Sequence, residues 1–178
     1  MRIVQASAAR QHTSYEAGSS LFELVVALII ISVLSAVLLN RLGFYKEMLE
    51  KAAMESTLRN IKTGLRVQLA ELIVTNRQAQ ARRLENEDPV QWLDEKPLNY
   101  GGSFRAPAET GTWYFDAQTH ELVYVVNTGN RLELDGDAAS KQLRFRVRLL
   151  KDRLNLFGNS IESVTGVALL PVRPYQWQ

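Results

Sequence analysis

The chain has 178 residues, of which 46% are hydrophobic, enough for one ordinary domain or for a smaller domain with an anchor. Its 21 basic and 19 acidic residues leave a formal charge of +2, which argues against a large electrostatic surface for nucleic acid. The absence of cysteine excludes disulfides, thiolate metal sites and cysteine nucleophiles, and two histidines are too few for a histidine-rich metal site.

A polar segment of residues 1–18 precedes a long apolar run from Leu24 to Leu39, which only Ser32 and Ser35 interrupt. As a helix, the 22 residues from Leu21 to Leu42 would extend roughly 33 Å, which is enough to cross a bilayer core. No small-residue cleavage site follows the run, as it would in a secretory signal peptide. We therefore expect residues 19–42 to remain in the protein as a transmembrane helix.

Residues 43–83 continue a helical pattern in which apolar residues recur at steps of three and four. We expect one helix from about Ser20 to Val74, with an extension to Arg83 and a bend near Gly43 as open alternatives. The expected buried face is Met54, Leu58, Ile61, Leu65, Leu69 and Leu72.

Charged residues form the opposite, solvated face of this predicted helix. Two pairs, Glu47/Lys51 and Glu55/Arg59, have the four-residue spacing that favours ion pairing on a helix. The face as a whole consists of Glu50, Lys51, Glu55, Arg59, Lys62 and Arg66.

Residues 84–108 are typical of a connector. Asp88 followed by Pro89 favours the start of a short helix up to Leu93, and the Gly101–Gly102 pair is expected to break regular structure. Residues 109–178 read as strands: a hairpin, one strictly alternating strand and a fourth strand. The segments are Trp113–Phe115 with Leu122–Val126, then Leu143–Leu149, then Val164–Leu170.

The predicted fold class is therefore α+β, with a long N-terminal helix, membrane-spanning in its first half, packed on a small antiparallel β-sheet. The aromatic residues are expected to fill the core between sheet and helix. They are Trp92, Trp113, Tyr114, Phe115 and Phe145.

Glu23 is an acid just inside the start of the apolar run. An ionised carboxylate in hydrocarbon is costly, so such a residue has a partner or a function unless it lies at the interfacial edge and reaches water. The residue type and its position leave both interpretations open.

The segment Gly18-Ser19-Ser20-Leu21-Phe22-Glu23 and the apolar run behind it resemble the N-terminal signature of type IV prepilins and type II secretion pseudopilins. That signature is a hydrophilic leader ending in Gly, a Glu at the fifth position after it, and a long apolar run. The resemblance implies a pilin-like fold and cleavage between Gly18 and Ser19 by a prepilin peptidase. It also implies methylation of the Ser19 amino group and pairing of Glu23 with the amino terminus of a neighbouring subunit.

The function implied by the resemblance is that of a filament subunit in a type II secretion pseudopilus or a type IV pilus. Its partners would be other pilin or pseudopilin subunits, the peptidase and an inner-membrane assembly platform. It would reside in the bacterial inner membrane with residues 43–178 in the periplasm before joining an extracytoplasmic filament. Ser19 in place of the usual Phe, no helix-breaking proline and no cysteine favour a pseudopilin or minor pilin over a major adhesive pilin.

The alternative function is a signal-anchored periplasmic binding or scaffold protein that does not assemble. We do not expect an enzyme, because no G-x-S-x-G elbow, phosphate-binding loop or paired-histidine metal motif occurs. No cofactor is expected either.

Two weaker patterns have competing interpretations. Asp135-Gly136-Asp137 is typical of a turn, although some major pseudopilins bind calcium through loop aspartates, which makes Asp135 and Asp137 calcium candidates. Arg144, Arg146 and Arg148 share one face of a predicted strand. We expect a solvated or acid-paired face there rather than a nucleic-acid site, because no aromatic residues alternate with the arginines.

Overall fold

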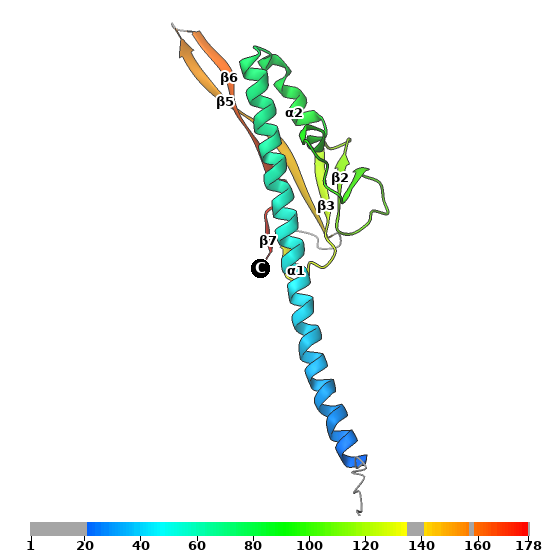
Figure 1. The fold of residues 1–178 in the computed structure, drawn as a ribbon. Coiled ribbons are helices and arrows are strands. Elements are labelled where there is room, and N and C mark those ends of the chain that lie inside the picture. The colour runs from blue at the N-terminus through cyan, green and yellow to red at the C-terminus, as the bar shows by residue number, and fades with distance from the viewer. Residues whose placement is uncertain (1–20, 135–140, 157–158, 178) are drawn as a thin grey trace, which may run out of the picture. The chain divides into compact units, whose positions relative to one another are not determined.

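The computed structural model of the chain describes residues 21–134, 141–156 and 159–177 (Figure 1). The fold is α+β, as predicted, with a long N-terminal helix, a five-stranded mixed sheet and a two-stranded sheet. The chain divides into two units, of which the first ends at Leu42 and the second begins at Gly43.

Helix α1 covers Leu21–Val74 as one continuous element of 54 residues, so the prediction of a single long helix is confirmed and Gly43 does not interrupt it. The helix does not continue to Arg83. Asn76 adopts a left-handed conformation with φ of 55°, and the Arg77 N–H donates to the Leu72 carbonyl at 2.8 Å. This is a Schellman-type end, which asparagine tolerates without a glycine. The chain then forms the short helices η1 (Gln78–Arg82) and α2 (Arg83–Asn86).

The apolar stripe of α1 packs where the sequence pattern places it. All six expected residues are buried, and none has more than 6% of its surface exposed. They form one core with the inner face of the five-stranded sheet and with Ala81, Leu84 and Val90 from the short helices that follow α1. The helix η2 (Pro89–Trp92) confirms the short helix expected after Asp88, whose Oδ1 accepts the Val90 N–H at 2.9 Å.

The main sheet has the strand order β1-β2-β3-β5-β6. The hairpin of β2 with β3 and the alternating strand within β5 are confirmed, and β5 and β6 form a long antiparallel pair. Strands β4 and β7 pair separately and antiparallel. The bounds are β1 Tyr100–Ser103, β2 Thr112–Asp116, β3 Glu121–Val125, β4 Leu132–Leu134, β5 Gln142–Leu156, β6 Asn159–Pro171 and β7 Tyr175–Trp177.

One strand corrects the expected antiparallel topology. β1 includes Gly101 and Gly102, which we expected to break regular structure, and it pairs parallel with β2. A Cβ added at Gly101 would lie 2.4 Å from Cε1 of Tyr114, so only glycine lets that ring lie against the strand. The sheet is therefore mixed, with the glycine pair in its edge strand β1.

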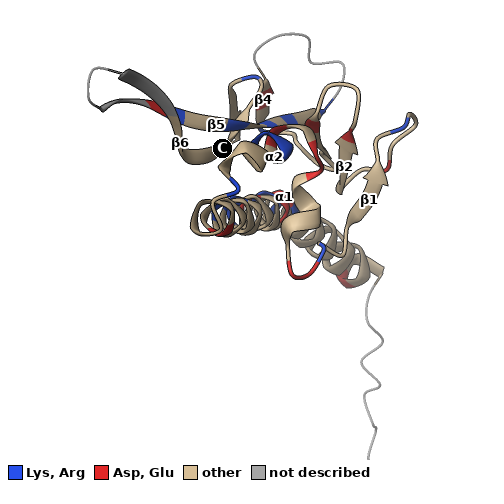
Figure 2. Ribbon diagram, turned by 90° about the horizontal axis from the view of Figure 1, so that it is seen from above, with Lys and Arg blue, Asp and Glu red and all other residues tan. Residues whose placement is uncertain are grey.

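The second unit has two layers, with α1 along one face of the sheet (Figure 2). Trp113 and Phe145 lie in the core between the layers as predicted, but Tyr114 lies on the outer face. Successive side chains of a strand point to opposite faces, so Tyr114 cannot follow Trp113 inward. It packs instead in a small outer cluster with Val123, Val125, Phe104 and Ala108.

Candidate functional site

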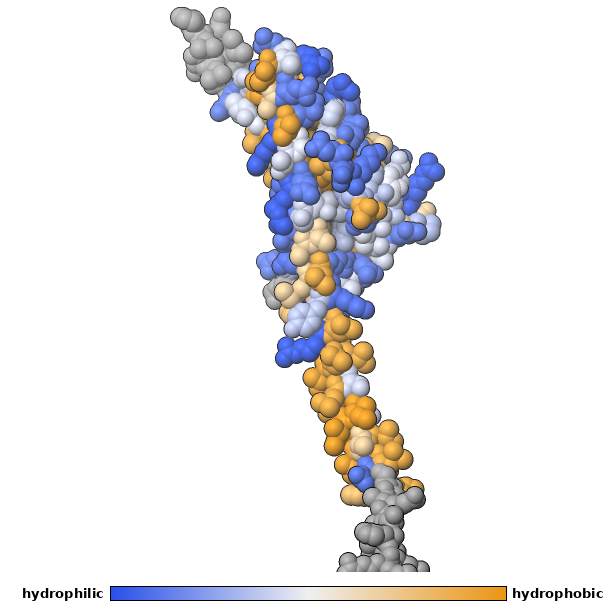
Figure 3. Space-filling model, in the orientation of Figure 1, coloured by the Kyte–Doolittle hydropathy of each residue, from blue (hydrophilic) through white to orange (hydrophobic). Residues whose placement is uncertain are grey.

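The first unit presents an apolar helical surface. Every residue from Leu21 to Leu42 is exposed, and hydrophobic side chains cover this segment of α1 (Figure 3). Removing one such leucine, isoleucine or valine side chain from water is worth about 1.5–3 kcal/mol. A helix with so many of them is compatible with a membrane or with other helices around it.

Glu23 is the acidic residue in the first turn of α1. Farther along, the hydroxyl of Ser32 donates to the Leu28 carbonyl at 2.7 Å, which satisfies this polar side chain within the helix, as expected. Gly18 and Ser19, the residues of the implied cleavage, lie outside the described residues.

In the second unit, three charged residues of α1 hold two distant segments of the chain. We call Glu47, Glu50 and Lys51 the α1 clamp. Glu47 is only 4% exposed, and its Oε1 accepts hydrogen bonds from Nε1 of Trp177 at 3.0 Å and from the Arg131 N–H at 2.8 Å. Lys51 Nζ donates to the backbone carbonyl of Trp177.

Glu50 binds the loop that follows β3. Its carboxylate accepts the N–H groups of Asn127 at 2.6 Å and Thr128 at 2.9 Å, the Thr128 hydroxyl, and the Tyr124 hydroxyl at 3.1 Å. Burial of the phenol, reinforced by the nearby Glu50 charge, raises the pKa of Tyr124 above its ordinary value. The α1 clamp therefore fastens this loop and the C-terminal strand to α1.

The sequence pattern did not reveal the α1 clamp. We expected Glu50 and Lys51 on the solvated face and Glu47 paired with Lys51, but these side chains turn to the sheet side instead. The other expected pair forms, with Arg59 and Glu55 3.9 Å apart. The spacing could have indicated this, because positions 47, 51 and 54 are four and three residues apart. They therefore continue the buried stripe of α1 toward its start.

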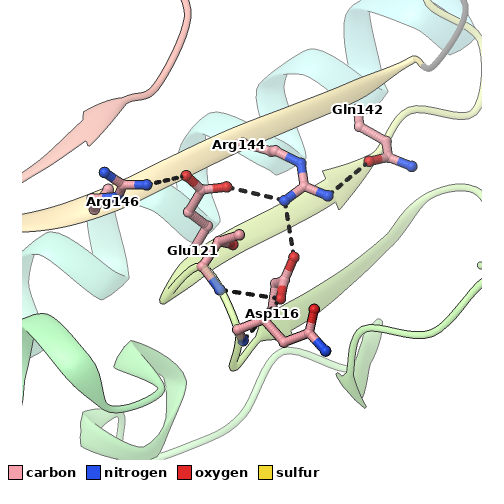
Figure 4. A network of polar contacts seen from close by, with 7 residues as sticks. Asp116, Glu121, Gln142, Arg144 and Arg146 are labelled. Atoms are coloured by element: carbon pink, nitrogen blue, oxygen red, sulfur yellow. Dashed lines mark hydrogen bonds and ion pairs between the residues drawn. The ribbon is translucent and has the colours of Figure 1, made fainter.

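Four charged residues form a second polar network on the outer face of the sheet (Figure 4). Arg144 Nη1 lies 3.0 Å from both Asp116 and Glu121, and Arg146 Nη2 lies 2.5 Å from Glu121. Burial opposes ionisation of Asp116, but hydrogen bonds from Arg144 and from the N–H groups that follow it outweigh burial and lower its pKa. The prediction of an acid-paired face is confirmed for these two arginines.

The described residues contain no group of three or more histidine, cysteine or acidic side chains that could hold a metal ion. The calcium candidates Asp135 and Asp137 lie outside the described part of the chain. The two polar networks above consist of ion pairs and hydrogen bonds that stabilise the second unit, although the buried Nε of Arg146 has no hydrogen-bond partner in the segments that the structure describes.

Comparison with protein-family models, with curated proteins and with solved structures found no match to this chain. Among the described residues, one helix near the N-terminus is long and apolar enough to cross a membrane. It is followed by a small sheet domain. The function proposed below is argued from these two features.

Proposed function

We propose that the chain is a membrane-anchored subunit of a pilin-like filament, a pseudopilin or minor pilin of a type II secretion pseudopilus or a type IV pilus. The observation that carries this proposal is the position of Glu23, in the first turn of a helix that is exposed at every residue to Leu42. Its spacing of five residues from Gly18 matches the prepilin signature.

In this proposal a prepilin peptidase of the bacterial inner membrane cleaves after Gly18, and the new amino group of Ser19 is methylated. The apolar segment anchors the subunit, and residues 43–178 lie in the periplasm. An assembly platform then moves the subunit from the membrane into the filament. In the filament, each apolar segment is surrounded by the apolar segments of neighbouring copies in place of lipid. Its hydrophobic side chains therefore stay out of water when the subunit leaves the membrane.

Glu23 sets the register between subunits in the assembled filament. The carboxylate pairs with the Ser19 ammonium group of a neighbouring copy, in surroundings of low dielectric where such a pair is strongly directional. Hydrophobic packing alone permits several axial offsets between two apolar helices, whereas a charge pair favours one offset.

The subunit acts by assembly and not by catalysis in this proposal. The exposed apolar face continues past the first unit as Tyr45, Met48 and Leu49, which are 54%, 50% and 69% exposed. These side chains extend the helical surface available to neighbouring subunits. No cofactor is required for this function.

N-terminal sequencing and intact-mass measurement of the protein from its native membrane test the proposal. We expect a chain that begins at Ser19 and carries one additional methyl group. A Gly18→Leu variant should keep the leader and fail to enter filaments, because a bulky residue prevents close approach of the scissile bond. An intact Met1 or cleavage elsewhere would instead support a signal-anchored periplasmic binding or scaffold protein.

A further inference from the structure

The outer face of the sheet is covered only in part. Phe104 and Ala108 pack over the β2–β3 side, whereas the β5–β6 side exposes several large apolar residues. We call this exposed surface the edge patch. It comprises Arg148, Leu150, Leu170 and Val172, and the three apolar members are 51%, 48% and 41% exposed.

Strand register puts the edge patch on one face. Arg148 pairs with Ala168, Leu150 with Gly166, and Leu170 with Arg146 across the two strands. The side chain of Leu150 lies over Gly166, where an added Cβ would be only 3.2 Å from it. Because the partners Ala168 and Gly166 on β6 are small, the side chains of Arg148 and Leu150 project from the sheet. An exposed apolar patch of this kind is typical of a docking surface.

The charge of the edge patch comes from Arg148. Arg144 and Arg146 are neutralised by Asp116 and Glu121, but Arg148 is exposed and forms no ion pair with any residue that the structure describes. An acceptor for this guanidinium must therefore come from solvent or from a partner. The edge patch favours a partner that combines an acidic group with an apolar side chain.

A loop on the helical side of the second unit has this combination. Residues 94–98, which we call the acidic loop, carry exposed Asp94 and Glu95, exposed Lys96 and a fully exposed Leu98. The start of the loop is held closely to α1, because a Cβ at Gly64 would lie 2.8 Å from the Trp92 carbonyl. Within the described segments, neither acid forms an ion pair.

The edge patch and the acidic loop lie on different sides of the two-layer unit. The edge patch is on the outer face of the sheet, on β5 and β6 (Figure 2), and the acidic loop follows η2, whose Trp92 carbonyl lies close to Gly64 of α1. Two different complementary surfaces on one molecule produce a head-to-tail contact, which continues from copy to copy and does not close into a symmetric dimer.

We propose that the acidic loop of one copy docks on the edge patch of the next copy. Leu98 packs against Leu150 and Leu170, and the carboxylates of Asp94 and Glu95 bind Arg148. This contact rests on the proposed function, because the filament brings copies of the second unit into repeated proximity. It adds a specific contact between sheet domains to the packing of the apolar helices.

Cysteine crosslinking of the full chain in its native membrane tests this contact, because the natural sequence has no cysteine. We expect the double variant Leu98→Cys with Leu170→Cys to give a ladder of dimers, trimers and larger species with a short thiol crosslinker. Each single variant should give no ladder. A second pair, Glu95→Cys with Leu150→Cys, should behave in the same way.

Charge exchange tests the ionic part of the contact in the crosslinking background. We expect Arg148→Glu to lower the yield of the ladder about tenfold, because an attractive contact becomes repulsive. Changing Asp94 and Glu95 to lysine in the same chain should restore most of the yield. Lack of restoration would overturn the pairing of the acidic loop with Arg148.

Recovery of the chain in sheared filaments separates this inference from the proposed function. If the double variants are recovered in filaments but give no ladder, the docking contact is wrong and the filament proposal stands. If the chain enters no filament, the filament proposal fails and the docking contact fails with it. Strong dimers from Leu170→Cys alone would show symmetric pairing and overturn the head-to-tail contact.

Discussion

The indole Nε1 of Trp177 donates a hydrogen bond of 3.0 Å to Oε1 of Glu47, which connects the C-terminal strand to α1 across 130 positions of sequence. The two residues are 5% and 4% exposed. The same oxygen accepts the Arg131 N–H, so a helix, a loop and a strand share one acceptor. Because a buried carboxylate loses its hydration, these hydrogen bonds are what permit Glu47 to lie in the core.

Replacing Glu47 with alanine should destabilise the second unit by about 2–4 kcal/mol. The substitution leaves the buried indole N–H of Trp177 and the partly buried N–H of Arg131 without their acceptor, and each unsatisfied buried donor costs about 1–3 kcal/mol. Urea unfolding of the purified full chain in detergent, followed by tryptophan fluorescence, measures the change. The matched control is Lys62→Ala on an exposed part of the same helix, expected to stay within about 0.5 kcal/mol of wild type. Equal stability of the two variants would show that Glu47 is not a structural residue.

The buried stripe of α1 can be tested with two substitutions only two residues apart. Leu65 is 1% exposed and Val67 is 63% exposed. Leu65→Ala should cost about 2–5 kcal/mol because it leaves a cavity between helix and sheet, whereas Val67→Ala should cost less than about 0.5 kcal/mol. The same denaturant titration gives both values. A comparable loss in the two variants would contradict the packing of α1 on the sheet.

The network around Asp116 should make stability depend on pH in the acid range. The pKa of Asp116 is lower in the folded chain than its ordinary value of 3.8, so its ionised form stabilises the fold. That stabilisation is complete above pH 3.8 and is lost as the pH falls through the folded-state pKa. Asp116→Asn should therefore be less stable than wild type at neutral pH, and the difference should shrink in acid. Thermal unfolding across this range measures it.

The control for this pH dependence is Asp152→Asn, which changes an exposed aspartate on β5. Because this side chain is exposed, the substitution should change stability at neutral pH by less than about 0.5 kcal/mol. A difference between wild type and Asp116→Asn that stays constant from neutral pH into strong acid would refute the assignment of Asp116 to this ionic network.

Glu23→Gln tests the step of assembly separately from the step of processing. The variant should still be cleaved after Gly18, because the cleavage motif is intact, but its incorporation into filaments should fall by at least about tenfold. The reason is that the Ser19 ammonium group of a neighbour then lacks its counter-charge in an apolar environment. Quantitative immunoblotting of sheared filaments against membrane fractions measures incorporation. Glu16→Gln is the control, since the proposed processing removes the leader that contains it. Normal incorporation of Glu23→Gln would refute the pairing.

Local pattern explains why so much of the fold was predictable. The stripe from Met54 to Leu72 repeats with the helical period, and Leu143–Leu149 alternates with the strand period, so each pattern identifies both the element and its buried face. The short helix after Asp88 has a local cap, which is also visible in sequence. These features depend on neighbours within one or two turns of chain.

Other features depend on contacts that no local pattern contains. Gly101 belongs to a strand that pairs parallel with β2, and the ring of Tyr114 from β2 lies against it. The end of α1 depends on the left-handed conformation of a single asparagine, Asn76, in a segment where helix propensity is otherwise favourable. For that reason the sequence left an extension of the helix to Arg83 open, although the predicted end at Val74 is the one observed.

The amino-acid sequence alone determined the apolar segment from Leu21 to Leu42, with Glu23 near its start, because length and hydrophobicity are additive properties of neighbouring residues. Only the tertiary structure decided that Glu47 is a buried acceptor for Trp177, because the partner is far away in sequence and a charged residue on a helix normally faces water. The same holds for the edge patch, since strand pairing brings Leu150 and Leu170 to one face.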